Sequence, residues 1–409
     1  MTARRRYAAI SFLTWLPTGL YIPPMVLLML DRGLSLPTIA AVSTVYSVVV
    51  ALLELPTGGL ADVLGRRPVL IASAIASMMS FVLFGLATTT FLFAIAAVLR
   101  GASRALSTGP AEAWYVDTVH TLEGPDADLG PGLARGSMAG SIALTIGTLA
   151  GGLMPLVLVG RVPVPLAVPI FIAAGVEAVR LTMVLVAMPE PRHHRARIRS
   201  VFQGVSMGAL SDGVIARVLL VAGGTGVALA TIELLTPAWL ATLTGAFETA
   251  GIAYAIVAAL GFAAGSLGNG LSMRLVRMAG SSAKGAAVGL LVMALALAGL
   301  AATTVLTGLN GVAVAAMAYS VIFVGLGAAV PAISTMLHGR VAAQQRATLI
   351  SMQSLSLQLS GAIGALAFAW VAAEAGLGVA FALCAAVMAG SALLIRSRDM
   401  SVLFAKLSR

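Results

Sequence analysis

Three ionisable residues, Glu54, Arg100 and Arg104, lie inside long apolar stretches of the sequence. A charged side chain is costly in hydrocarbon, so an acid or base retained there is by default a candidate for function. A carboxyl group next to an arginine could exchange a proton or hold an ion. At a helical rise of about 1.5 Å per residue, Glu54 and Arg104 fall at similar depths and could pair.

Arg100 and Arg104 are one helical turn apart, where like charges repel, so any acid that pairs with Arg100 must come from another helix. Three further acids lie closer to the ends of apolar stretches and are secondary candidates for the same cavity: Glu112, Asp31 and Glu233. The alternative interpretation of Glu54 and Arg100 is a structural ion pair that only braces the helices.

Glu177 and Arg180 form another charged pair inside an apolar stretch. Their i,i+3 spacing places them on one face of a helix, where they can satisfy each other. We interpret this pair as structural.

No residue pattern in the sequence indicates an enzyme. There is no nucleophile–base motif, no metal-ligand spacing and no Walker-type phosphate loop. His193 and His194 are adjacent but lack further ligands for a metal, and the single cysteine, Cys384, excludes an internal disulfide. We therefore expect no catalytic activity, no metal and no cofactor.

The elements that must position these residues are membrane-spanning helices. Of the 409 residues, 59% are hydrophobic and only 10% are charged, whereas soluble domains carry roughly 25% charged residues. A spanning helix needs about 20 apolar residues. Twelve such windows predict an all-α membrane protein: 7–30, 37–59, 68–88, 91–113, 133–158, 163–188, 213–236, 246–270, 282–304, 308–332, 347–373 and 376–395.

The net charge of +10 does not indicate a nucleic-acid partner, because the basic residues sit in short gaps between apolar windows. Most of the 25 Lys and Arg residues fall on one side of the membrane when both termini are placed in the cytoplasm, and only Arg32 and Arg161 fall in the outer segments. This favours a multi-pass protein of the bacterial cytoplasmic membrane. We expect an N-terminal half (1–188), a cytoplasmic linker (189–212) and a C-terminal half (213–409). The Gly- and Pro-containing stretch 117–135 is expected to be a flexible loop.

A glycine- and arginine-rich motif follows the second window. Glycines allow a sharp turn, Asp62 can pair with arginine or accept hydrogen bonds from a helix N-terminus, and Arg66 and Arg67 anchor the loop at the cytoplasmic face. A weaker copy, Gly270–Arg277, follows the eighth window. The first motif contains Gly58, Leu60, Ala61, Asp62, Gly65, Arg66, Arg67 and Leu70.

This motif resembles the G-x-L-A-D-x-x-G-R-R-x-x-L signature of the major facilitator superfamily, although Val63 departs from it and Met273 replaces the acid in the second copy. The resemblance implies twelve helices in two pseudo-symmetric six-helix halves. It implies that the motif loop latches the halves in the outward-facing state, and that a fourth-helix arginine, best matched by Arg100, assists proton coupling. Topology anchoring alone is the alternative role of the motif.

A second resemblance lies in the fifth window, where Gly147, Gly151 and Gly152 match part of the G-P-x-x-G-G stretch of proton-coupled antiporters. Thr148 stands where proline is expected. Small residues at this spacing also simply allow helices to pack closely, so both interpretations stay open.

The leading functional expectation is proton-driven efflux of hydrophobic small molecules, as in bacterial drug:proton antiporter-like members. A largely apolar cavity suits lipophilic, neutral or cationic compounds better than sugars. The alternatives are a proton-coupled uptake carrier for a metabolite and, from another class, a membrane receptor or scaffold. The expected partners are a small hydrophobic substrate, protons and the lipid bilayer, and we expect a monomer.

Overall fold

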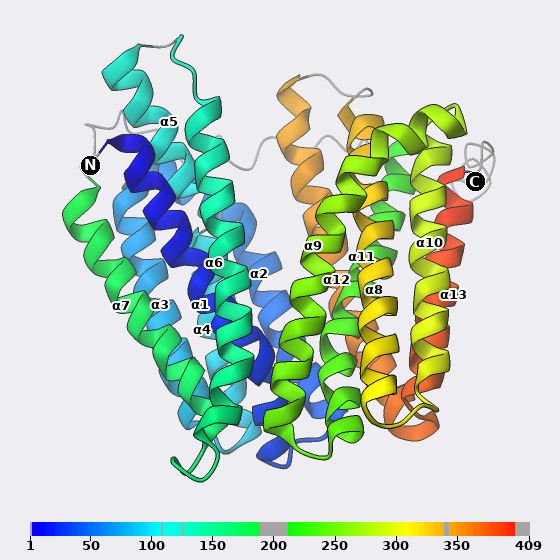
Figure 1. Ribbon diagram of the computed structural model, residues 1–409. Coiled ribbons are helices and arrows are strands. Elements are labelled where there is room, and N and C mark those ends of the chain that lie inside the picture. Colours follow the sequence, from blue (N-terminus) through cyan, green and yellow to red (C-terminus); the bar gives the residue numbers. More distant parts are fainter. Residues whose placement is uncertain (1, 108, 125, 189–211, 339–342, 397–409) are drawn as a thin grey trace. The chain divides into compact units, whose positions relative to one another are not determined.

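The structure, a computed structural model, describes residues 2–107, 109–124, 126–188, 212–338 and 343–396, without the side chains of 55–63, 338, 343–348 and 350. Within these ranges the chain is helical, and no strand occurs (Figure 1). Twelve helical segments there are long and apolar enough to cross a membrane, which confirms the predicted fold class. The predicted linker lies outside the described residues except for Asp212.

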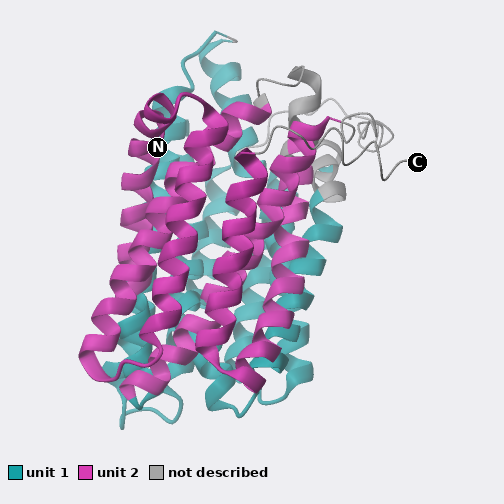
Figure 2. Ribbon diagram, turned by 90° about the vertical axis from the view of Figure 1, so that its right-hand side faces the viewer, with its two compact units in different colours: residues 1–203, 245–255 teal, residues 204–244, 256–409 magenta. Residues whose placement is uncertain are grey.

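The chain divides into two compact units (Figure 2). Unit 1 comprises residues 1–203 and 245–255, and unit 2 comprises 204–244 and 256–409. The helices of unit 1 are α1 (Ala3–Asp31), α2 (Leu36–Leu64), α3 (Arg66–Leu86), α4 (Thr90–Ser107), α5 (Pro110–Glu123), α6 (Gly130–Leu158), the short η1 (Pro165–Ala167) and α7 (Val168–Ala187). The helices of unit 2 are α8 (Gly213–Thr244), most of α9 (Phe247–Ala279), α10 (Ser282–Thr303), α11 (Gly308–His338), α12 (Ala343–Ala375) and α13 (Leu377–Arg396).

The two units repeat the same pattern of helix pairing. In unit 1, α1 packs on α6 and α7, and α3 packs on α4 and α7. In unit 2, α8 packs on α12 and α13, and α10 packs on α11 and α13. Counted as spans, the pairs are first with fifth and sixth, and third with fourth and sixth, in both units. The weak sequence repeat therefore corresponds to a structural repeat.

The fourth span differs from its prediction. The window 91–113 does not form one continuous helix, because α4 ends at Ser107 and α5 begins at Pro110, a residue suited to the first turn of a helix. The stretch 117–135, expected to be a loop, is helical up to Glu123 and again from Gly130. Packing holds the preceding part of α5: the ring of Tyr115 stacks on that of Tyr7 in α1 at 4.9 Å between centroids, and Trp114 is buried.

The superfamily-like motif is also more helical than expected. Helix α2 continues to Leu64 and α3 begins at Arg66, so Gly65 is the only residue between them. Its φ of 98° is a conformation that side-chain-bearing residues rarely adopt. In unit 2, the stretch Gly270–Arg277 lies within α9, and Gly280, with φ 79°, makes the corresponding turn before α10. The helices therefore turn over one or two residues rather than through a loop.

Candidate functional site

A chain of buried and partly buried polar contacts crosses unit 1 from α1 to α7. Arg100 of α4 donates from Nη2 to Thr18 Oγ1 of α1 at 2.8 Å, and from Nη1 to Ser77 Oγ of α3 at 3.4 Å. Ser77 in turn donates to Glu177 Oε1 of α7 at 2.9 Å. Glu177 accepts a further bond from Arg180 Nε at 2.5 Å. Four helices are thus joined by one continuous set of hydrogen bonds.

Serines along α3 add further contacts with α4. Ser73 Oγ accepts from Arg180 Nη2 at 3.3 Å and donates to the backbone oxygen of Ser103 at 3.0 Å. Ser103 Oγ donates back to the backbone oxygen of Ser73 at 2.9 Å. Ser80 Oγ bonds the backbone oxygen of Ala96 at 2.8 Å. The small hydroxyl side chains let α3 and α4 approach closely while satisfying backbone acceptors in an apolar bundle.

The three charged members of the network differ in whether an opposite charge neutralises them. Glu177 and Arg180 are 2% and 1% exposed, and they neutralise each other. The predicted pair is therefore confirmed, but Ser77 also connects it to Arg100, a link that spacing along one helix did not predict. Arg100 is only partly buried. Its guanidinium lies over the ring of Phe81, at 4.8 Å from the centroid, and near that of Tyr21, at 5.9 Å.

Arg104 lies on α4, one turn from Arg100, and Glu54 lies on α2, which packs against α4. The Arg104 guanidinium lies over the indole ring of Trp15 in α1, at 5.4 Å from its centroid. Glu54 is partly buried on α2, and both Glu54 and Arg104 make further polar contacts. Their mutual pairing stays a prediction.

The secondary acidic candidates occupy three separate places. Asp31 is the last residue of α1 and is exposed. Glu112 is exposed in the first turn of α5, beyond the break that follows α4. Glu233 is exposed in the interior of α8, while Ile232 and Leu234 beside it are buried. None of the three contributes a hydrogen bond to the Arg100 network in the described part of the chain.

The basic residues of the motif tie the ends of several helices together. Arg66 Nη2 lies 3.4 Å from Asp117 Oδ2 of α5, and Arg67 donates to the backbone oxygen of Leu185 in α7. Arg4 of α1 pairs with Glu123 of α5 at 2.8 Å. The side chain of Asp62 is not among those that the structure describes, so the predicted role of Asp62 stays a prediction.

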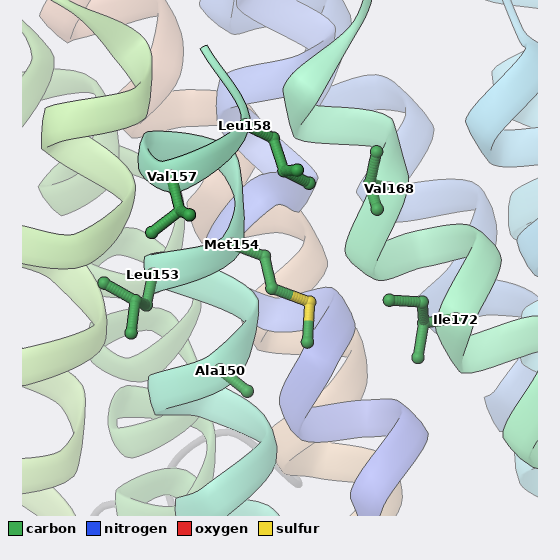
Figure 3. A pocket seen from close by; sticks show the side chains of 7 residues that line it. All are labelled: Ala150, Leu153, Met154, Val157, Leu158, Val168 and Ile172. Atoms are coloured by element: carbon green, nitrogen blue, oxygen red, sulfur yellow. The ribbon is translucent and has the colours of Figure 1, made fainter. Parts of the chain in front are cut away.

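An apolar groove of about 400 Å³ lies between α6 and α7 (Figure 3). All seven side chains that line it are apolar: Ala150, Leu153, Met154, Val157, Leu158, Val168 and Ile172. A groove without a polar group cannot orient a ligand by hydrogen bonding, so the candidate chemistry of unit 1 belongs to the arginine network. Among the described residues, no cluster of three or more His, Cys, Asp or Glu side chains could hold a metal ion.

Residues 7–324 match the sequence profile of the Major Facilitator Superfamily. The chain belongs to this superfamily. No curated protein sequence matches it. Among solved structures, it is similar to the nucleoside transporter NupG, with a TM-score of 0.77 and 12% identity over 97% of this chain and 98% of that one. It is also similar to the human organic anion transporter MFSD10, with a TM-score of 0.61 and 18% identity over 97% and 100% of the chains.

A bacterial homologue of the human lysosomal transporter Spinster, in an inward-facing and unoccupied conformation, has a TM-score of 0.68 and 16% identity over 98% of this chain and 95% of that one. Identities this low show the common fold alone. Superfamily membership and the fold together identify a multi-pass membrane transporter rather than an enzyme.

The glycine stretch of the fifth span, α6, packs closely against neighbouring helices. A Cβ added at Gly147 would lie 2.6 Å from the Leu16 backbone oxygen of α1, and one at Gly151 would lie 2.5 Å from that of Leu20. Gly152 faces the first turns of α9 that belong to unit 1, where a Cβ would lie 2.5 Å from the Gly251 backbone oxygen. Close helix packing is thus confirmed for this stretch, and its antiporter-specific meaning stays a prediction.

Proposed function

We propose that this transporter exports hydrophobic small molecules in exchange for protons, by alternating access across the bacterial cytoplasmic membrane, with both termini in the cytoplasm. The observation that carries the proposal is Arg100, a partly buried cation in an apolar bundle whose contacts reach α1 and α3. Any shift of α1 against α4 changes the hydrogen bonds of Arg100, so this side chain responds to movement of the neighbouring spans.

Glu54 is the proposed proton carrier, since it is a partly buried acid on α2, a span that packs directly against α4. Glu233 is the best alternative carrier. It is exposed in the interior of α8. The other described acids of unit 2, Asp212 and Glu374, lie at helix ends instead. An acid at such a position is expected to face water rather than lipid. Glu112 and Asp31 lie at helix ends as well.

The two six-helix halves, 1–188 and 213–409, are proposed to alternate around the substrate, with the 189–212 segment as their cytoplasmic linker. In this proposal Asp62 latches the halves in one state. The one-residue turn at Gly65 supports a latch at this point, because it places Asp62 in the last turn of α2, directly before α3 begins.

The test is transport by everted membrane vesicles energised with a proton gradient. The probes are ethidium, which is cationic, N-phenyl-1-naphthylamine, which is neutral, and 8-anilinonaphthalene-1-sulfonate, which is anionic. We expect accumulation of at least one probe inside everted vesicles that contain the protein, and its loss when an uncoupler is added. Glu54→Gln should abolish this accumulation. The matched control is Glu374→Gln, an identical change at an exposed residue near the end of α12.

Three outcomes would decide against parts of the proposal. Proton-driven accumulation in right-side-out vesicles only would reverse the direction and make the protein an uptake carrier. Uncoupler-sensitive transport by Glu54→Gln would move the coupling site, with Glu233 as the next residue to replace. Absence of protein-dependent transport for every probe would refute export of hydrophobic compounds as a class.

A further inference from the structure

Arg100 is an intramembrane arginine of unit 1 that has no neighbouring carboxylate among the described residues. Arg180 has Glu177 at salt-bridge distance. Arg100 instead contacts two neutral hydroxyl groups, on Thr18 and Ser77, and no carboxylate reaches it within the residues that the structure describes. Ser77 connects it to Glu177, but that carboxylate already neutralises Arg180.

The surroundings of Arg100 hold its charge without cancelling it. The faces of Phe81 and Tyr21 attract a guanidinium through their ring quadrupoles, which leaves the net charge in place. A guanidinium has five N–H donors, and Thr18 and Ser77 accept from two of them. The remaining donors meet no protein acceptor in the part of the chain described here. The side chain is only partly buried, so it is not sealed off from a molecule that binds beside it.

A cation in these surroundings favours a bound anion. An unpaired charge in a low-dielectric interior is unfavourable, and an arriving opposite charge relieves it. The planar fork of arginine matches the two or three oxygens of a carboxylate, sulfonate or phosphate. The rings of Tyr21 and Phe81 next to it offer an apolar wall for a hydrocarbon body. A cationic molecule would meet repulsion from the same residue.

We propose that Arg100 binds an acidic head group of the substrate, so that the transported compounds are amphipathic organic anions rather than cations. This inference rests on the proposed transport function and specifies its substrate class. In it Arg100 is a substrate-binding residue, and Thr18 and Ser77 are positioning residues that aim its guanidinium.

The experiment measures equilibrium binding to the purified full-length protein in lipid nanodiscs. The probes share a naphthalene body and differ in head group: 1-naphthoate, 1-naphthalenesulfonate and 1-naphthyl phosphate are anionic, 1-naphthamide is neutral and 1-naphthylmethylammonium is cationic. A charge-assisted bond to arginine predicts that at least one anion binds about tenfold or more tightly than the amide. The ammonium compound should bind more weakly than the amide.

Two variants assign the effect to Arg100. Arg100→Gln should remove the preference for anions while leaving the affinity for the amide within about twofold, an estimate for loss of one charged contact alone. Arg100→Lys should retain part of the preference, because lysine keeps the charge but lacks the planar fork. The matched control is Arg161→Gln, which removes an exposed positive charge between α6 and η1 and should leave the preference unchanged.

The inference is overturned if no anion binds, if the amide or the ammonium compound binds as well as the best anion, or if Arg100→Gln keeps the preference. If Arg100→Gln does not fold, the two other variants decide. The inference is then overturned if Arg100→Lys keeps the full preference for anions, or if Arg161→Gln loses that preference. Failure of this inference is distinguishable from failure of the transport proposal. Uncoupler-sensitive transport without anion preference removes only the inference, whereas anion binding at Arg100 without proton-driven transport removes only the proposed function.

Discussion

Replacing Glu177 by glutamine is expected to destabilise unit 1 severely, although the two side chains have nearly the same shape. Glu177 and Arg180 are 2% and 1% exposed, so the change leaves a buried guanidinium without its carboxylate. Removing one partner of a buried ion pair typically costs about 3–5 kcal/mol. Arg180 has little means of recovering this loss, because its Nη1 already lacks an acceptor in the described structure.

A double variant isolates the uncompensated charge from the loss of contacts. Glu177→Gln combined with Arg180→Met removes both charges and keeps two side chains of useful volume at the site. Replacing a complete buried pair by apolar side chains is often close to neutral. We therefore expect the double variant to recover most of the stability that the single variant loses. Ser77→Ala, which removes only the hydroxyl between Arg100 and Glu177, should cost about 1 kcal/mol.

The assay is reversible unfolding of the purified protein in mixed micelles by increasing mole fractions of dodecyl sulfate. Trp15 and Trp114, which lie in unit 1, report on this unit when Trp239 and Trp370 of unit 2 are replaced by phenylalanine. A loss below about 1 kcal/mol for Glu177→Gln would contradict the reasoning, since exposed pairs have that magnitude. A double variant as unstable as the single one would also contradict it.

Four further predictions rest on the sequence and the structure together. Gly147→Ala should destabilise the protein by about 1–3 kcal/mol in the same unfolding assay, because its methyl group would meet the Leu16 backbone oxygen, whereas Gly175→Ala on α7, which meets nothing within 4 Å, should be neutral or stabilising. Asp62→Asn should leave the protein in the membrane but severely reduce transport, and normal transport by well-expressed variant protein would reduce the motif to a topology signal. An epitope tag at either terminus should be inaccessible to antibody in intact cells, and labelling from outside would reverse the predicted orientation. If a monovalent anion leaves in exchange for one proton, each transport cycle moves two charges across the membrane. An imposed potassium diffusion potential of 100 mV should then contribute about 4.6 kcal/mol of driving force. Transport of 8-anilinonaphthalene-1-sulfonate that does not respond to this potential would exclude that exchange.

The sequence was sufficient for the twelve spans because hydropathy over about 20 residues is a strong signal. It was insufficient where a span continues beyond its apolar part. The stretch 117–135 was predicted to be a loop because it is acidic and contains glycine and proline, yet it is helical up to Glu123 and again from Gly130. Packing of Tyr115 on Tyr7 stabilises the turns of α5 that precede it. The motif around Gly65 was likewise expected to be a loop, because glycine content does not distinguish a one-residue turn from a longer one.

The candidate site shows the same division between local and tertiary information. The Glu177–Arg180 pair could be predicted because i,i+3 spacing on a helix determines the contact. Its connection to Arg100 depends on which helices lie side by side, and spacing within one helix carries no such information. One signal was available: Ser73, Ser77 and Ser80 recur at i, i+4 and i+7, which marks a polar stripe on an otherwise apolar helix.

The close contact between α1 and α6 also constrains the order in which the protein is made. Gly19 of α1 meets Gly147 of α6 almost backbone to backbone, but about 130 residues separate the ends of the two helices, and a ribosome adds roughly 5–20 residues per second. The first span therefore waits on the order of ten seconds in the bilayer before its partner emerges. During that time its glycine face is open to any other small-residue helix nearby. Until the fifth span arrives, this face of α1 must be covered by lipid or by another protein, and that temporary contact must be released before α6 can pack.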